Sequence, residues 1–173
     1  LYWDNSNSQL YAIDGRAVAP KSAGPNLFTD RNSKAIKFYP DAVINGKSVG
    51  IPGLIKLMGE THKKFGKLQW KELFIEPIKI AEEGFIVSPA LHNTLQYMRY
   101  LKAVEPASSL YFEKNNLNQL EPIKIGSILI NQEYAKTLKR LSKNGADDFY
   151  EGETAQMIIN TVNNSDNVSD ILT

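Results

Sequence analysis

The sequence contains no cysteine among its 173 residues. This absence excludes disulfide bonds, thiolate nucleophiles and thiolate metal sites. Such a composition suits an exported bacterial protein, although it does not require one. The two histidines, His62 and His92, fall within expected helices and lack the spacing of a metal site. We therefore interpret them as helix-surface or hydrogen-bonded core residues, and we expect no metal and no other cofactor.

The chain also lacks an excess of charge of one sign and a long apolar run. Its formal net charge is +1, so it has no basic excess of the kind that nucleic-acid-binding proteins use to contact phosphates. No run approaches the roughly 18 apolar residues of a membrane-spanning helix. Hydrophobic residues make up 42% of the chain and charged residues 23%, which is typical of a globular domain with a sizeable core. We expect neither a nucleic-acid partner nor a membrane span in this segment.

Helical periodicity dominates the stretch from Ser48 to Pro89. Pro52 stands where a helix can begin, because its missing N–H would have no partner there. Gly66 is predicted to end this first helix in a left-handed cap. A second helix is predicted over about residues 70–83, and Pro77 should kink or split it. Three- and four-residue spacings predict an inward face made of Leu54, Leu57, Met58, Thr61, Phe65, Leu73, Phe74, Ile78 and Ala81.

The remaining segments are predicted from turn and cap signals. Residues 1–13 form a hairpin, and residues 24–40 form a loop with a brief strand at Ile36 and Phe38. A third helix starts at Ser88-Pro89 and ends at Glu105-Pro106. Its inward stripe is Leu91, Leu95, Met98 and Leu101 or Lys102, widened by Tyr97 and Tyr100. A polar segment (108–119) and a short strand or extended segment (122–126) come next. Helices then follow from Asn131 to Gly145 and from about Gly152 to Val162, with inward Tyr134, Leu138, Leu141, Ala155, Ile158, Ile159 and Val162.

This order of elements predicts an α+β chain with a helical majority. We divide it into a strand and loop segment, residues 1–47, and a helical region, residues 48–173. Residues 163–167 are predicted to be a flexible end.

Arg16 is the residue that we select as a candidate binding group. It follows a predicted strand and Gly15, so its side chain emerges at a strand end, where sites are commonly built. A guanidinium is always charged and can make two parallel hydrogen bonds to a carboxylate. On these residues alone, a solvated arginine in a turn remains the simpler interpretation.

Six motifs stand in a fixed order along the chain: Asp14-Gly15-Arg16-Ala17-Val18-Ala19-Pro20, Ser48-Val49-Gly50-Ile51-Pro52-Gly53, Phe65-Gly66-Lys67-Leu68-Gln69-Trp70, Pro77-Ile78-Lys79-Ile80-Ala81-Glu82-Glu83-Gly84-Phe85, Val87-Ser88-Pro89 and Gly145-Ala146-Asp147-Asp148-Phe149-Tyr150-Glu151-Gly152-Glu153. Their order and spacing resemble the large subunit of the gamma-glutamyltransferase family of N-terminal-nucleophile hydrolases. The resemblance covers nearly the whole chain.

The resemblance implies a four-layer αββα sandwich, of which this chain would supply an edge and the helices beside it. It also implies an enzyme that cleaves gamma-glutamyl amide bonds, such as that of glutathione, by hydrolysis or transfer. Family members cleave themselves to expose an N-terminal threonine on a small subunit, and this threonine attacks the amide carbonyl. The implied partners are that small subunit and a gamma-glutamyl or other carboxylate-bearing amide. The implied location is periplasmic or extracellular.

The resemblance assigns substrate binding to Arg16 and no catalytic residue to this chain. In the family, the arginine of an Arg-Glu-x-Ala-Pro motif holds the α-carboxylate of the substrate, and Arg16 matches it. The family's nucleophile opens a Thr-Thr-His type segment, whereas Thr61-His62 here lies inside an expected helix and is interpreted as structural. Because the chain begins at Leu1 within an expected strand, we interpret it as the middle of a large subunit that cannot turn over substrate alone.

One departure from the family pattern leaves the substrate open. Ala17 stands where the family has glutamate, and a methyl group can neither accept a hydrogen bond nor recognise the ammonium group of a substrate. Related acylases and amidohydrolases of the superfamily act on carboxylate-bearing amides without an α-amino group, and Arg16 would suit these substrates too. A third alternative is a helical interaction module without catalysis.

Overall fold

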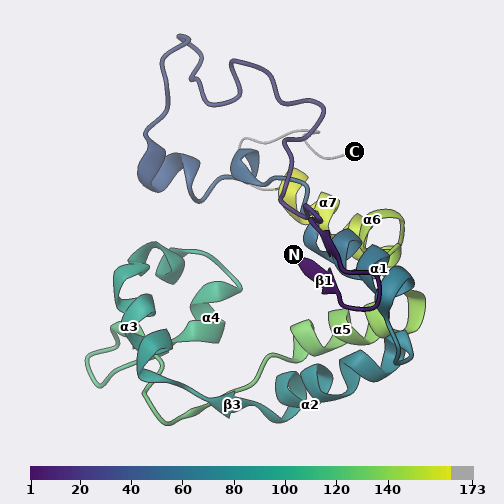
Figure 1. Ribbon diagram of the computed structural model, residues 1–173. Coiled ribbons are helices and arrows are strands. Elements are labelled where there is room, and N and C mark those ends of the chain that lie inside the picture. Colours follow the sequence, from purple (N-terminus) through teal and green to yellow (C-terminus); the bar gives the residue numbers. More distant parts are fainter. Residues whose placement is uncertain (165–173) are drawn as a thin grey trace. The chain divides into compact units, whose positions relative to one another are not determined.

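The computed structural model describes residues 1–164 (Figure 1). They form two compact units. The first comprises Leu1–Glu72 and the described residues from Arg140 onward, and the second comprises Leu73–Lys139. Most of the predicted flexible end, residues 165–167, lies outside the described residues.

The first unit opens with the predicted hairpin. Strand β1 (Tyr2–Asp4) pairs antiparallel with β2 (Gln9–Tyr11), and Tyr2 lies opposite Tyr11. The hydrogen bonds that Ser6 and Asn7 donate to the Asp4 carboxylate close the turn. The bond from Ser6 contributes most to lowering the pKa of Asp4. The Tyr2 ring stacks on Phe65, with 4.0 Å between ring centroids, so the hairpin packs on the last turn of the first helix.

Helix α1 (Leu54–Phe65) forms close to where the sequence predicts it, but it begins two residues after Pro52, behind its N-cap Gly53. Leu57 and Phe65 are half-buried as predicted. Leu54 and Met58 are 52% and 46% exposed, so the predicted inward face is too wide. The reason is that the hairpin and the backbone at Gly15 cover only one edge of this face.

Gly66 ends α1, but not in the predicted left-handed conformation. It has φ −65° and ψ 140°, which is extended backbone. The segment that follows folds back on the helix, and the Leu68 carbonyl lies 2.9 Å from His62 Nε2. This contact replaces the left-handed cap as the way in which the chain leaves the helix.

The predicted brief strand at Ile36 and Phe38 is wrong. The loop forms a single antiparallel bridge between Thr29 and Ala35, because the Asp30 carboxylate closes a tight turn by accepting hydrogen bonds from two backbone amides. Phe38 begins an irregular helical turn, Phe38–Ala42, and is 80% exposed. A 3₁₀ turn, Gly46–Ser48, follows behind its cap Asn45.

Two helices complete the first unit, α6 (Asp148–Glu151) and α7 (Glu153–Asn163). The predicted inward residues of α7 are buried or half-buried, and Val162 lies at the centre of a cluster with Leu27, Val49, Ile51, Ile158 and Ile159. Sequence periodicity did not predict α6, because four residues are too few to show a helical period.

The second unit is built around α2 (Ile75–Glu83) and its contacts with α5 (Gln132–Asn144). The predicted split in the second helix is confirmed, since a 3₁₀ turn, Trp70–Phe74, precedes α2. Pro77 therefore falls in the first turn of α2, where backbone N–H groups have no partner within the helix, so its missing N–H costs no helical hydrogen bond. The core of this unit consists of Ala81, Ala135 and Leu138, with Phe74 and Ile78 packed against them.

Four side chains of the second unit that were predicted to face inward are exposed: Leu73 at 43%, Tyr97 at 86%, Met98 at 38% and Tyr134 at 55%. Tyr97 ends α3 (Pro89–Tyr97) and Met98 is its non-helical C-cap, so the predicted stripe does not continue past them. Leu73 belongs to the 3₁₀ turn, whose period of three residues takes it off the face that α2 buries. Tyr134 lies in the first turn of α5, and its amide donates to the Asn131 cap.

Helix α3 (Pro89–Tyr97) begins at the predicted Ser88 cap, whose hydroxyl accepts a hydrogen bond from Leu91 N. The helix ends earlier than predicted, because Met98 has ψ 48° and a 3₁₀ turn, Arg99–Ala103, follows. The Arg99 side chain donates to the Gln96 carbonyl and so satisfies an acceptor that the last helical turn leaves free.

Short elements fill the rest of the second unit. Helix α4 (Ala107–Tyr111) leads into a hairpin of β4 (Phe112–Lys114) and β5 (Leu120–Pro122), and β3 (Phe85–Ile86) pairs with β6 (Ile128–Leu129). The predicted polar segment thus holds a helical turn and half of a hairpin. With three two-stranded antiparallel pairs among its described residues, the chain is α+β and mainly helical, as predicted. Across residues 1–164, no helix combines the length and apolarity needed to cross a bilayer.

Replacing Leu138 by alanine should destabilise the second unit. Leu138 is 7% exposed and packs in the core between α2 and α5, so Leu138→Ala should cost about 2–5 kcal/mol. Denaturant unfolding of the full-length protein that contains this chain would measure the loss. Leu117→Ala is the matched control, because Leu117 is 77% exposed. A Leu138→Ala midpoint equal to that of this control would contradict the core assignment.

Candidate functional site

Arg16 lies in the turn that follows β2. The Asp14 carboxylate accepts a hydrogen bond from the Arg16 amide at 2.8 Å, which fixes the backbone of this turn locally. The Arg16 side chain is exposed. Among residues 1–164, its guanidinium makes no hydrogen bond and no ion pair. Its donors are therefore available to a ligand.

The segment after Arg16 is tied to the start of α1. Val18 and Ile51 form an antiparallel bridge, with Val18 N 3.0 Å from Ile51 O and Ile51 N 2.8 Å from Val18 O. These two bonds join a loop that would otherwise be held only by its own turn. They fix the Arg16 loop from its C-terminal side.

Two glycines allow the Arg16 loop to lie directly on α1. A Cβ on Gly53 would lie 2.8 Å from the carbonyl oxygens of both Gly15 and Arg16, and a Cβ on Gly15 would lie 2.7 Å from Leu57 Cβ. Both distances are shorter than ordinary contacts, so no larger residue fits at either position without displacing the loop. The backbone of Arg16 therefore rests on the first turn of α1.

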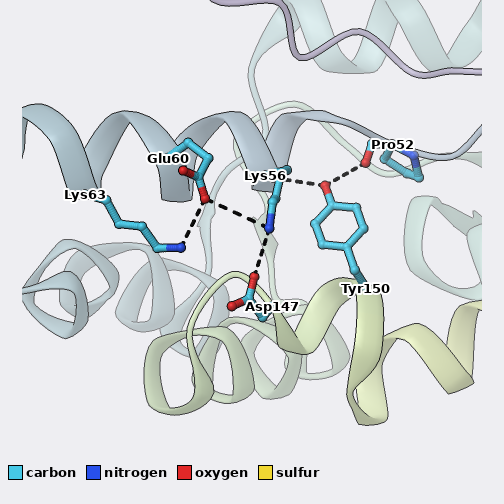
Figure 2. Close-up of polar contacts among 6 residues, drawn as sticks. All are labelled: Pro52, Lys56, Glu60, Lys63, Asp147 and Tyr150. Atoms are coloured by element: carbon cyan, nitrogen blue, oxygen red, sulfur yellow. Dashed lines mark hydrogen bonds and ion pairs between the residues drawn. The ribbon is translucent and has the colours of Figure 1, made fainter.

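The first turn of α1 is capped by a distant residue. Gly53, the N-cap, has no side chain with which to accept from the free amides, which every helix start leaves unpaired. Figure 2 shows the Tyr150 hydroxyl accepting from Lys56 N at 2.9 Å and donating to Pro52 O at 2.7 Å. Tyr150 belongs to α6, so α6 supplies the cap that Gly53 cannot.

A chain of charges runs along the same side of α1 (Figure 2). Lys56 Nζ lies 3.2 Å from Asp147 Oδ1 and 3.9 Å from Glu60 Oε1, and Lys63 Nζ lies 3.0 Å from the same Glu60 oxygen. The hydrogen bond to Asp147 is the main cause that raises the pKa of Lys56. These pairs are exposed and contribute little stability. Only the pair of Lys56 with Asp147 joins α1 to the start of α6.

Asp148 anchors α6 to the start of α7. It is 7% exposed, and its two carboxylate oxygens accept from Thr154 Oγ1 at 2.5 Å and from Asn144 Nδ2 at 3.1 Å. Arg140 Nε donates to the same Thr154 hydroxyl at 3.2 Å. Burial raises the pKa of Asp148, but the hydrogen bonds from Thr154 and Asn144 outweigh it and leave the pKa lowered.

Both histidines have the structural surroundings that the sequence predicts. His62 Nε2 lies 2.9 Å from Leu68 O and its ring meets the edge of Trp70, whereas His92 Nδ1 lies 2.8 Å from Ile123 O. Thr61-His62 lies within α1, as predicted. No cluster of three or more potential metal ligands occurs within the described part of the chain.

Comparisons with known proteins show the family to which the chain belongs. The model of the gamma-glutamyltranspeptidase family matches residues 1–171. The glutathione hydrolase proenzyme of Bacillus subtilis is 33% identical over 162 residues, which are 94% of this chain and 27% of that protein. The chain belongs to the gamma-glutamyltranspeptidase family.

Two solved structures share the fold. The gamma-glutamyltranspeptidase of Helicobacter pylori matches 90% of this chain with a TM-score of 0.77 and 26% identity, and this chain covers 44% of it. The gamma-glutamyltranspeptidase of Pseudomonas nitroreducens, complexed with L-DON, matches 88% of this chain with a TM-score of 0.70 and 29% identity. This chain covers 42% of that structure. The chain spans about a quarter of the length of the curated relatives that it matches.

The sequence did not single out Tyr150, Asp147 or Asp148 as parts of the site. The only signal for them was the motif from Gly145 to Glu153, which combines acids and aromatic residues between two glycines. Its role depends on the contacts of Tyr150 and Asp147 with α1 and Pro52, which the sequence alone does not show.

Removing the charge of Asp148 should make stability less dependent on acid pH. With a lowered folded pKa, the ionised carboxylate stabilises the fold above the unfolded pKa of about 4, and this contribution disappears as pH falls through the folded pKa. Asp148→Asn should therefore unfold about 1–3 kcal/mol more easily than wild type at pH 7. The two proteins should begin to converge below about pH 4 and should reach equal stability only once the pH is below the folded pKa.

Denaturant midpoints of the full-length protein between pH 3 and pH 8 would measure both effects. Asp41→Asn is the control, because Asp41 is exposed and should leave the midpoint nearly unchanged. A gap between wild type and Asp148→Asn that is as wide at pH 3 as at pH 7 would contradict the assignment.

Proposed function

We propose that this chain is part of the large subunit of a gamma-glutamyltransferase-like enzyme. The whole protein would process itself into a heterodimer and cleave gamma-glutamyl amide bonds, such as that of glutathione, by hydrolysis or transfer. The catalytic threonine would stand on the small subunit, and this chain would contribute substrate binding. Membership of the family supports this proposal, and the absence of cysteine is compatible with a periplasmic or extracellular location.

The observation that carries the proposal is the exposed guanidinium of Arg16 on a loop whose backbone is held in place. Arg16 N is hydrogen-bonded to the Asp14 carboxylate and Val18 is bridged to Ile51. The backbone from which the Arg16 side chain projects is therefore fixed. A bidentate guanidinium–carboxylate pair requires such fixed geometry. We assign to Arg16 the binding of a substrate carboxylate.

Changing Arg16 should weaken substrate binding more than turnover. Arg16→Lys keeps the charge but loses the two parallel hydrogen bonds, and Arg16→Gln loses both. A charge-assisted hydrogen bond contributes about 1.5–3 kcal/mol, so kcat/KM should fall roughly ten- to hundred-fold. Most of this should appear in KM, with Gln worse than Lys. Steady-state kinetics of the full-length enzyme on gamma-glutamyl-p-nitroanilide would measure it.

Two controls separate carboxylate binding from a general loss of activity. A substrate whose α-carboxylate is amidated should hardly distinguish wild type from Arg16→Gln, because the partner of the guanidinium is gone. Arg31→Gln, at another exposed loop arginine, should behave as wild type. If Arg16→Gln leaves KM and kcat unchanged on every carboxylate-bearing substrate, Arg16 is only a turn arginine.

The exposed methyl group of Ala17 favours a second candidate substrate class. Next to Arg16 it offers no acceptor for a substrate ammonium group. An amidohydrolase or acylase for carboxylate-bearing amides that lack an α-amino group would use Arg16 in the same way. Both candidates share the carboxylate and differ only in the α-ammonium group.

Ala17→Glu should shift preference toward substrates that carry an α-ammonium group. The new carboxylate would lie beside the substrate and could accept charge-assisted hydrogen bonds, so the ratio of kcat/KM for gamma-glutamyl over glutaryl anilides should rise about ten-fold or more. Ala35→Glu, at another exposed loop alanine, is the control for added charge. An unchanged ratio in Ala17→Glu would show that this position does not set the preference.

A further inference from the structure

The residues just before α1 contact the Arg16 loop on both sides of Arg16. Gly53 lies against the carbonyl oxygens of Gly15 and Arg16, and Ile51 is bridged to Val18. Residues 51–53 therefore support the backbone of the Arg16 loop. A shift of these residues moves the backbone from which the guanidinium projects.

The Tyr150 hydroxyl bonds to the chain on both sides of Gly53. Tyr150 Oη bonds to the carbonyl of Pro52 and to the amide of Lys56 (Figure 2). Pro52 directly precedes Gly53 and Lys56 follows it by three residues, so the hydroxyl fixes the chain on both sides of Gly53. Gly53 has no side chain that could do this, and a side chain there would collide with the Arg16 loop.

The position of Tyr150 is itself fixed by other residues. Asp148, two residues earlier in α6, is buried and accepts hydrogen bonds from Thr154 and Asn144. The Phe149 and Tyr150 rings meet edge to face at 5.3 Å. The hydroxyl is therefore presented to α1 by a rigid support.

We propose that Tyr150 is a positioning residue, which sets the place of the Arg16 guanidinium through the first turn of α1 and thereby tunes the binding of a substrate carboxylate. This inference rests on the proposed function of Arg16. The Tyr150 side chain acts through the backbone of residues 51–53 and contributes no group to the substrate.

Removal of the hydroxyl isolates this role from packing. Tyr150→Phe keeps the ring beside Ile51 and Pro52 but leaves Lys56 N and Pro52 O without this partner. In the full-length enzyme, KM for gamma-glutamyl-p-nitroanilide should rise about three- to ten-fold, with kcat nearly unchanged. This is less than the loss of both hydrogen bonds could cause, because they act on Arg16 only through the backbone. A substrate with an amidated α-carboxylate should show no such rise. Tyr134→Phe is the matched control, because Tyr134 is 55% exposed.

A double-mutant cycle with Arg16→Gln separates positioning from a merely structural role. If Tyr150 acts through Arg16, Tyr150→Phe should add no further rise in KM once Arg16 is glutamine. A structural effect would raise KM by the same factor in both backgrounds. Additive effects, or an unchanged KM in Tyr150→Phe, would overturn the inference while leaving Arg16 its function. Arg16→Gln without any effect would remove the proposed function, and the inference with it.

Gly53→Ala provides a second test that does not touch Tyr150. Gly53 has φ −94° and ψ −10°, which alanine adopts without strain, so only the collision with the Gly15 and Arg16 carbonyls changes. Its KM should rise on the carboxylate substrate and not on the amidated one. Gly24→Ala is the control, since a Cβ there meets no atom within 4 Å. Wild-type KM in Gly53→Ala would overturn the inference even if Tyr150→Phe fails to fold.

Discussion

The Tyr150 hydroxyl is the interaction that joins α6 to the start of α1, on which the Arg16 loop lies. It joins Lys56 and Pro52 to a residue that lies 94 and 98 positions further along the chain. A helix start with glycine at its N-cap leaves amides unpaired, because glycine has no side chain that could accept from them. The distant tyrosine thus permits a glycine at position 53, and that glycine permits the close approach of the Arg16 loop.

This dependence explains how an exposed arginine can be fixed without contacts to its own side chain. The guanidinium of Arg16 stays available because the constraint acts on its backbone, through Asp14 on one side and Ile51 on the other. Ordering a side chain by ion pairs would occupy the donors that a ligand needs. A site held through the main chain keeps its binding capacity and its geometry at the same time.

The sequence predicted the elements whose signals are local. Ser88 and Asn131 cap helices through their own side chains, and Gly145 ends α5 with φ 85°, so each signal lies beside its effect. The predicted inward faces were less accurate, because burial of Leu54 or Leu73 depends on which distant segment covers the helix. For the site, the sequence indicated Arg16 only through its motif, and Tyr150 could not be found, since its partners lie more than 90 residues away.

The sequence separation of this cap also sets an order of events during synthesis. Ribosomes add roughly 5–20 residues per second, and domains generally fold as units while the chain emerges. Because 94 residues separate Lys56 from Tyr150, α1 waits about 5–20 s for its cap. All of the second unit, Leu73–Lys139, is synthesised in this interval. The first turn of α1, and with it the Arg16 loop that lies on this turn, therefore gains this constraint only after the second unit has been synthesised.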